Sequence, residues 1–215
     1  NEVAYNREYR TFTGTLEGIP VSVTSTGMGG PSTAIAVEEL HECGARTMLR
    51  VGTCESLSRL VKVGQLVLPN GAVRMEGVAQ QYAPLEFPAI PDMSLFASLA
   101  ETAGEMGKTY HIGIDVTKAC FSYAAFERPV SSALHARWQA YRAGGALCAD
   151  MGCAPLFVAA RTLGVRAAAV LAVAFNDGQY SDDANDWPEA CEALVCDVAV
   201  AAMRKLILQE RDGVA

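Results

Sequence analysis

The 215-residue chain lacks the features that would assign it to a membrane, secreted or disordered class. No apolar run reaches the roughly 18 residues of a membrane span. No basic segment followed by an apolar one stands near Asn1, so no signal peptide is expected. Hydrophobic residues make up 51% of the chain and charged residues only 19%. This balance excludes disorder over most of the length and predicts one domain with a large buried core.

Positive charge is also scarce. The chain has 17 Lys and Arg residues against 24 Asp and Glu residues, which gives a net charge of −7. A nucleic-acid binder or an electrostatic membrane binder needs a basic face, so both classes are excluded. A local arginine cluster can still bind a phosphate-bearing small molecule.

Paired metal-binding and disulfide motifs are missing as well. The seven cysteines include no CxxC pair, and an odd number does not fit a disulfide framework. Most of them lie in apolar runs, which predicts a reduced, cytoplasmic protein with thiols in its core. The three histidines show no metal spacing, so no metal site is expected.

Apolar runs alternate with helical patterns along the chain. Short apolar or β-branched runs predict strands, and a period near 3.6 residues predicts helices. A strand–helix–strand order favours parallel pairing with helices on both sheet faces. The expected strands span residues 21–24, 47–51, 65–68, 110–117 and 165–175, and the expected helices span 33–43, 93–106, 154–163 and 189–208.

A glycine-rich turn follows the strand over 21–24. It contains Gly27, Gly29 and Gly30, and Ser32 is the expected N-cap of the next helix. Backbone N–H groups at such a turn favour an anion. No Lys follows as in a P-loop, and the glycine spacing differs from a dinucleotide fingerprint. A tight structural turn is the alternative.

A second candidate anion site is Arg50-Val51-Gly52-Thr53, where the strand over 47–51 is expected to end. A guanidinium matches phosphate oxygens, and a threonine hydroxyl adds a donor. In open α/β sheets, ligands bind at the carboxyl ends of strands. We therefore expect the glycine turn and Arg50 to lie at adjacent strand ends and to form one phosphate pocket. The alternative is a solvent-facing arginine on an edge strand.

These motifs carry a resemblance. Residues 27–40, 49–53, 72–77 and 82–89, in this order, resemble the nucleoside phosphorylase family. The run Ala-Pro-Leu-Glu-Phe-Pro-Ala over 83–89 is similar to the uridine branch. The resemblance implies a three-layer α/β/α fold with a distorted mixed sheet over residues 1–215, without the family's N-terminal Gly-Asp-Pro segment. It also implies phosphorolysis of a nucleoside to the free base and ribose 1-phosphate, with inorganic phosphate as co-substrate and no cofactor.

The resemblance also assigns roles to residues. It implies phosphate binding by Gly27, Arg50, Thr53 and an Arg7 lent by a neighbouring subunit, and hence a homodimer or a higher homo-oligomer. Arg50, Thr53 and Asp177 are the expected catalytic residues. The expected nucleoside-binding residues are Met28, Phe126, Arg128 and Met151.

Four positions depart from the family pattern. Glu55 replaces a glycine, Phe126 a base-reading glutamine, and Gly152 the glutamate that holds the ribose hydroxyls. Asp177 stands where the uridine branch has arginine and the purine branch has a general acid; a simple loop acid is the other interpretation. These departures support an alternative function, namely a catalytically impaired relative that binds nucleoside or phosphate as a regulatory subunit.

Glu55 follows Arg50 closely on the same expected turn. A carboxylate beside a guanidinium forms a strong pair and occupies the groups that phosphate needs. We therefore expect Arg50 to be neutralised by Glu55 or another acid, and phosphate binding to be weak.

Overall fold

The strands of the central sheet close into a barrel. The computed structural model describes residues 1–120, 132–176 and 189–213. The barrel strands are β4 (Thr47–Ser56), β5 (Leu66–Arg74), β6 (Tyr110–Thr117), β7 (Cys148–Asp150) and β8 (Arg166–Asn176). Their order around the barrel is β4-β7-β6-β5-β8. The β4–β8, β5–β6 and β6–β7 pairs are parallel, and the β4–β7 and β5–β8 pairs are antiparallel.

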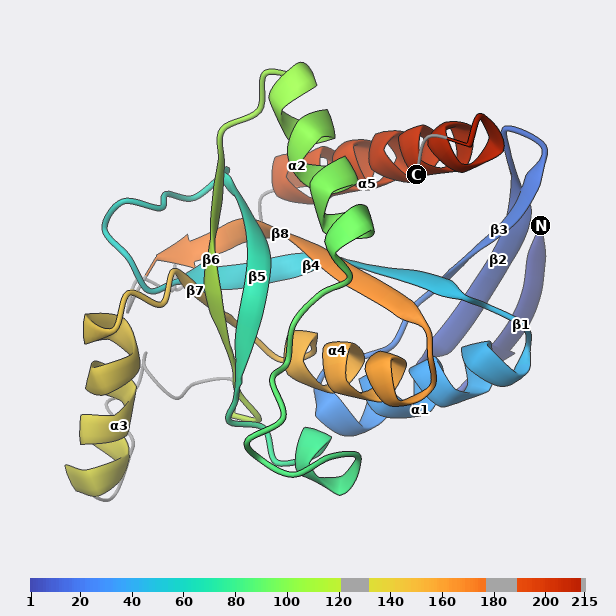
Figure 1. The fold of residues 1–215 in the computed structure, drawn as a ribbon. Helices are drawn as coiled ribbons and strands as arrows, with labels where there is room; N and C mark the ends of the chain where they lie inside the picture. Colours follow the sequence, from blue (N-terminus) through green and yellow to red (C-terminus); the bar gives the residue numbers. More distant parts are fainter. Residues whose placement is uncertain (121–131, 177–188, 214–215) are drawn as a thin grey trace.

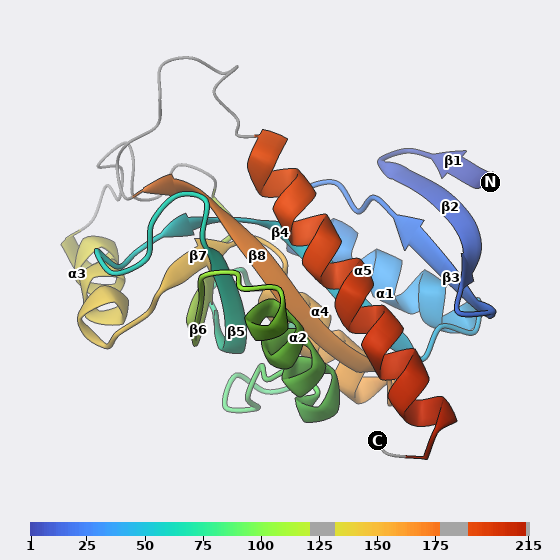
Figure 2. The same cartoon turned by 90° about the horizontal axis from the view of Figure 1, so that it is seen from above.

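Helices cover the sheet on both sides. The helices are α1 (Gly30–Glu42), α2 (Met93–Glu105), α3 (Ser132–Ala143), α4 (Cys153–Thr162) and α5 (Glu189–Arg211), and η1 (Ala79–Gln81) is a short 3₁₀ turn. Helices α1 and α4 pack together on one side, and α2 and α5 pack together on the other (Figures 1 and 2). This mixed sheet between helices confirms the expected α/β/α class. None of the described helices combines the length and apolar character that a membrane span requires.

Strand β8 joins the two halves of the core. Its odd-numbered residues, such as Leu171 and Val173, pack in the cluster that contains α4. Its even-numbered residues, such as Val170 and Ala172, pack in the cluster that contains α2 and α5. A strand buried on both faces reads as a continuous apolar run, so the expected strand over 165–175 is confirmed.

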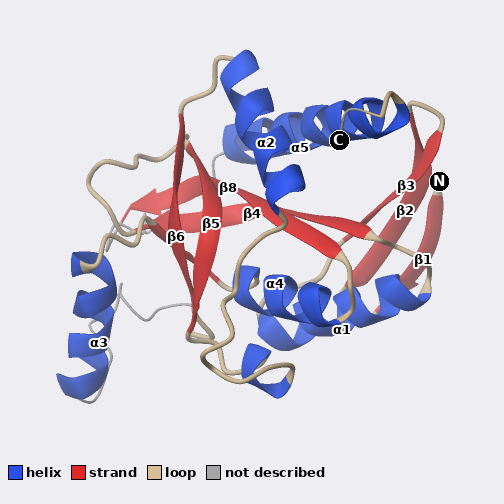
Figure 3. Cartoon of the chain, viewed as in Figure 1, coloured by secondary structure: helices blue, strands red, loops and turns tan. Residues whose placement is uncertain are grey.

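A separate three-stranded antiparallel sheet stands beside the barrel (Figure 3). Its strands are β1 (Glu2–Asn6), β2 (Tyr9–Leu16) and β3 (Ile19–Thr24). The expectation of a buried, parallel strand over 21–24 is wrong, because β3 pairs with β2 and is largely exposed. The two-residue turn Glu17-Gly18 has φ of 52° and 83°, which suits a tight hairpin and favours this local pairing.

Three element boundaries also differ from expectation. Strand β4 continues to Ser56, so Arg50 lies inside the strand rather than at its end. Strand β5 continues through Pro69-Asn70-Gly71, where the register shifts, so this segment is a bulge and not a stop. Helix α1 begins at Gly30 after an N-cap at Gly29, and Ser32 lies inside it.

Candidate functional site

Arg50 is anchored by a buried carboxylate. Its Nε donates a hydrogen bond to Asp150 Oδ2 at 2.8 Å, and the Asp150 side chain is 0% exposed. A β-carbon added to Gly152 would lie 2.9 Å from Arg50 Cζ, and one added to Gly52 would lie 3.3 Å from Nη2. The guanidinium therefore rests against two positions that have no side chain. Burial acts to lower the pKa of Arg50, but the charge of Asp150 outweighs it and raises that pKa, so Arg50 stays charged.

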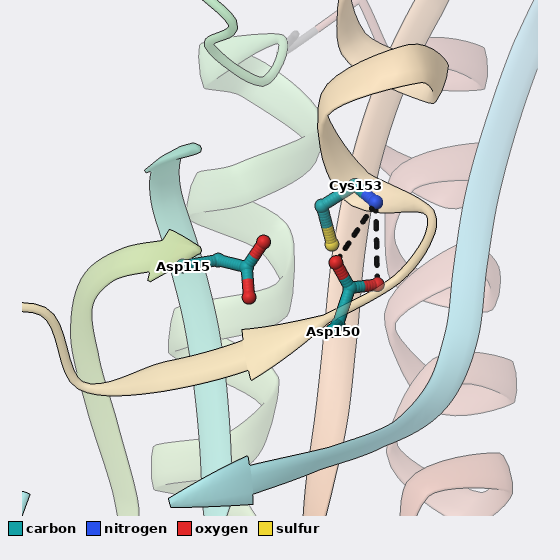
Figure 4. A group of neighbouring side chains, drawn as sticks. All are labelled: Asp115, Asp150 and Cys153. Atoms are coloured by element: carbon teal, nitrogen blue, oxygen red, sulfur yellow. Dashed lines mark hydrogen bonds between the residues drawn. The ribbon is translucent and has the colours of Figure 1, made fainter. Parts of the chain in front are cut away.

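Asp150 also organises the start of α4. The backbone N–H of Gly152 donates to its carboxylate at 3.0 Å. The backbone N–H of Cys153 donates to Oδ1 at 3.1 Å and to Oδ2 at 3.2 Å (Figure 4). Burial acts to raise the pKa of Asp150, but the Arg50 charge and the hydrogen bonds to its carboxylate outweigh this and lower that pKa. Asp150 is therefore an ionised group that fixes both a helix start and the arginine.

Asp115 completes this buried cluster. Oxygen atoms of Asp115 and Asp150 and the Sγ of Cys153 lie within 4.8 Å of one another, a grouping that can hold a metal ion (Figure 4). The oxygens already have donors, however. Asp150 accepts from Arg50 and from the backbone, and Asp115 accepts from the Thr117 hydroxyl at 2.6 Å. These donors occupy carboxylate oxygens that a metal ion would need.

Glu55 has a different partner from the one expected. Its Oε2 accepts a hydrogen bond from Lys118 Nζ at 2.6 Å, and both side chains are buried. Lys118 Nζ also lies 5.9 Å from the ring centroid of Trp138. The expectation that an internal acid pairs with Arg50 is confirmed, but Glu55 as that acid is wrong. Asp150 holds only the Nε of Arg50, and the expected weak binding of phosphate stays a prediction. The partner is Asp150 because it lies on β7 beside Arg50, whereas the Glu55 charge is offset by Lys118.

Thr53 and the glycine turn have different places in the fold from the pair of Arg50 and Asp150. Thr53 is three residues beyond Arg50 on β4, an odd separation that places it on the opposite face of a regular strand. The glycine turn follows β3, which does not belong to the barrel, so the expectation of adjacent strand ends in one sheet is wrong. Joint contact of Thr53, Gly27 and Arg50 with one phosphate stays a prediction.

The turn at Gly27 meets the β1–β2 hairpin of its own chain. A β-carbon added to Gly27, which has φ of 62°, would lie 2.9 Å from the Glu8 side chain. Next to Glu8, Arg7 has φ of 55°, lies over the Tyr9 ring and is 3.7 Å from Glu39 of α1. Its side chain is 54% exposed, so it is accessible to a neighbouring subunit.

The nucleoside-binding residues are described only in part. Met28 is 81% exposed in the glycine turn, and Met151 is half-buried between Asp150 and Gly152. Phe126, Arg128 and Asp177 lie outside the described residues.

Asp115 and Lys118 were not identified from the sequence as site residues. A signal for Asp115 was present, because an aspartate between Ile114 and Val116 interrupts an apolar strand pattern, and fully buried acids are rare unless they are paired. No spacing rule links Lys118 to Glu55, which lies 63 residues earlier.

Comparisons with known proteins agree with this fold. Residues 1–208 match the Phosphorylase superfamily. The chain is 40% identical to the uridine phosphorylase of Treponema pallidum, with 98% of this chain and 82% of that protein covered. It is 33% identical to the uridine phosphorylase of Escherichia coli, with 96% of this chain and 83% of that protein covered. It is 35% identical to the guanosine phosphorylase of Halorubrum lacusprofundi, with 84% and 74% covered. With its α/β/α barrel, its anchored arginine and a match over nearly its whole length, the chain belongs to the phosphorylase superfamily.

Proposed function

We propose that the protein catalyses phosphorolysis of a nucleoside, with uridine as the first candidate substrate. The observation that carries this proposal is the Arg50 guanidinium. Asp150 holds its Nε, and its two terminal nitrogens make no hydrogen bond to the described residues. Terminal nitrogens of a charged guanidinium suit phosphate oxygens. The similarity to two uridine phosphorylases supports uridine over other nucleosides.

The reaction moves one glycosidic bond from nitrogen to oxygen. A phosphate oxygen attacks C1′ of the ribose, and the bond from C1′ to the base nitrogen breaks with its electron pair on the base. The base then takes up a proton, and ribose 1-phosphate is the other product. In this proposal phosphate is held by Arg50, Thr53, Gly27 and a neighbour's Arg7, the nucleoside contacts Met28, Phe126, Arg128 and Met151, and Asp177 lies near the leaving base.

The proposal includes a homodimer, because Arg7 serves the neighbouring subunit. Support comes from the small antiparallel sheet that carries Arg7. Its strands expose large apolar side chains, which monomeric proteins rarely gather in one patch. These residues are Val3, Tyr5, Phe12, Ile19 and Val23, each between 41% and 71% exposed.

We place the protein in the cytoplasm. All seven cysteines are free thiols, and Cys54, Cys148, Cys153 and Cys191 are buried. Thiols of this kind are typical of a reducing compartment.

The test is an assay of base release from uridine, thymidine, inosine and methylthioadenosine at saturating phosphate. We expect release of uracil that depends on phosphate, and at least about a hundredfold loss in Arg50→Gln, the scale of removing one group that stabilises a transition state. Arg46→Gln is the control, because Arg46 is exposed and, in the part of the chain that the structure describes, its side chain bonds only the local backbone and His41. Release from inosine alone assigns a purine substrate, and no release from any of the four overturns the proposal.

A further inference from the structure

Asp115 is a buried acid that the proposed reaction does not use. It is 0% exposed on β6, directly behind the pair formed by Arg50 and Asp150. The Thr117 hydroxyl donates to Asp115 Oδ2 at 2.6 Å and accepts from the backbone N–H of Ala154 at 2.9 Å. Thr117 therefore has no hydrogen left for another acceptor, and its orientation is fixed by the start of α4.

The groups that face Asp115 come from every element packed around it. Thr117 lies on its own strand, Asp150 and Cys148 on β7, and Cys153 at the start of α4, while Arg50 and Cys54 lie on β4. The Cys148 thiol lies 3.6 Å from Asp115 Oδ1. Arg50 carries the positive charge of this cluster, and Asp150 neutralises it.

Two carboxyl groups this close in a dry cluster do not both ionise. Burial raises the pKa of Asp115 well above its usual range, and the charge of the nearby Asp150 carboxylate raises it further. The pKa of Asp150 is lowered instead, because Arg50 contacts Asp150. This arrangement therefore favours one carboxylic acid, Asp115, beside one carboxylate, Asp150, that pairs with the Arg50 guanidinium.

We propose that Asp115 is a positioning residue for Arg50. As a neutral carboxylic acid beside Asp150, it holds the Asp150 carboxylate in place, so that the terminal nitrogens of Arg50 remain available to phosphate. This inference rests on the proposed function, because it assigns Arg50 to phosphate. An ionised Asp115 adds a negative charge beside the anion site, repels phosphate and competes for the guanidinium. Protonation of Asp115 therefore favours binding of an anion such as phosphate at Arg50.

The test compares Asp115→Asn with wild type in calorimetric titrations with inorganic phosphate at pH 7.5 and pH 9.5. The amide has the shape of the protonated acid and cannot ionise. We expect similar affinities at pH 7.5, within about threefold, and at least about fivefold weaker binding by wild type than by the variant at pH 9.5, which is about 1 kcal/mol. Asp92→Asn is the matched control for the lost charge, because Asp92 caps α2 and has no contact with Arg50. Parallel pH dependence of wild type and Asp115→Asn overturns the proposal.

A steady-state measurement separates positioning from general damage. We expect Asp115→Leu to raise KM for phosphate at least about tenfold, which is about 1.4 kcal/mol, while KM for the nucleoside stays within twofold. We expect Asp115→Asn to have a KM for phosphate close to that of wild type. Equal effects of both variants on both substrates identify a purely structural role and overturn the inference.

A spectroscopic readout keeps the inference apart from the proposed function. If wild type binds no phosphate, the proposed function fails, and the Arg50 Nε–H resonance in nuclear magnetic resonance spectra tests the positioning by itself. We expect a slowly exchanging Nε–H signal in wild type and in Asp115→Asn, and its loss in Asp115→Leu. If Asp115→Leu does not fold, loss of the signal in Asp115→Asn alone overturns the inference.

Discussion

The guanidinium of Arg50 occupies the space in which a side chain at Gly152 would begin. A β-carbon at Gly152 would lie 2.9 Å from both Cζ and Nη1 of Arg50 and 3.1 Å from Nε. The absence of a side chain at Gly152 therefore has a steric role, because it lets Arg50 reach Asp150.

Gly152→Ala tests this relationship. The added methyl group meets the end of the Arg50 side chain, which must move away from Asp150. The buried Asp150 carboxylate then loses its cation but keeps its backbone hydrogen bonds, so we expect a stability loss of about 3 kcal/mol in urea unfolding. The displaced guanidinium loses Asp150, and we expect KM for phosphate to rise at least about tenfold. Gly14→Ala is the control, since nothing lies within 4 Å of a β-carbon at Gly14. Equal phosphate KM values for the two variants contradict the prediction.

The buried pair of Lys118 and Glu55 predicts a large loss of stability in Lys118→Met. Removal of one partner leaves the Glu55 charge buried without its cation, which costs about 3–5 kcal/mol. Within the described residues Glu55 Oε1 has no hydrogen-bond partner, so Lys118 is the main support of this carboxylate. Urea unfolding of Lys118→Met and of the double variant Glu55→Gln with Lys118→Met measures this. We expect the double variant to recover most of the free energy of unfolding that Lys118→Met loses. A free energy of unfolding of Lys118→Met within about 1 kcal/mol of wild type would refute a stabilising role of the pair.

Asp115 makes stability depend on pH in a defined direction. Its pKa is raised in the folded state, while the unfolded value is about 3.9. The folded protein therefore binds a proton that the unfolded chain has lost, and its stability falls as pH rises above about 4 towards the folded pKa. We expect Asp115→Asn to melt at a higher temperature than wild type at pH 8, and the difference to shrink towards pH 4. Calorimetric melting across this range checks the sign, and a difference that grows towards pH 4 contradicts it.

The proposed role of Arg7 in the neighbouring subunit predicts that two impaired variants complement each other in a mixed dimer. We expect Arg7→Gln and Arg50→Gln each to be impaired, because each removes one guanidinium from the proposed phosphate site. If Arg7 acts on the neighbouring subunit, a mixed dimer regains one complete site, and random pairing restores about a quarter of wild-type activity. Arg10→Gln, in the same hairpin and paired with Glu2, is the control and should retain full activity.

The measurement is an activity assay after both variants are denatured and refolded together, with each variant refolded alone as the baseline. No increase above the baseline places Arg7 outside the neighbour's site. Thermal melting of Arg7→Gln should stay close to wild type, because the exposed contact of Arg7 with Glu39 contributes less than about 1 kcal/mol.

The sequence predicted the elements whose patterns are local. Strand β6 has the expected bounds, and α2 and β8 lie within one residue of theirs, because an amphipathic period or a continuous apolar run determines them. Strand β7 has only three residues and no pattern of its own, since its partners β4 and β6 define it. Such an element cannot be recognised before the fold is known.

The candidate site shows the same difference between local signals, which the sequence contains, and contacts that depend on the fold. Arg50 could be selected because its residue type and motif are local. Its partner could not, because Asp150 lies 100 residues away and reaches Arg50 only through the pairing of β4 with β7. Glu55 was the nearest acid in sequence, but chain proximity gave the wrong partner because Lys118 lies closer in space.

The closed barrel determines where strands of another chain can add. The barrel closes through short contacts, because β7 pairs with only two residues of β4 and β8 pairs with only two residues of β5. Within the described residues β1 and β3 are the outer strands of the small sheet, and each has a partner strand on one side along its whole length. Strand addition by another chain, whether in an ordered assembly or in aggregation of the folded protein, is therefore expected first at this sheet. Charged substitutions on β1 and β3 offer a way to improve solubility without any change to the barrel.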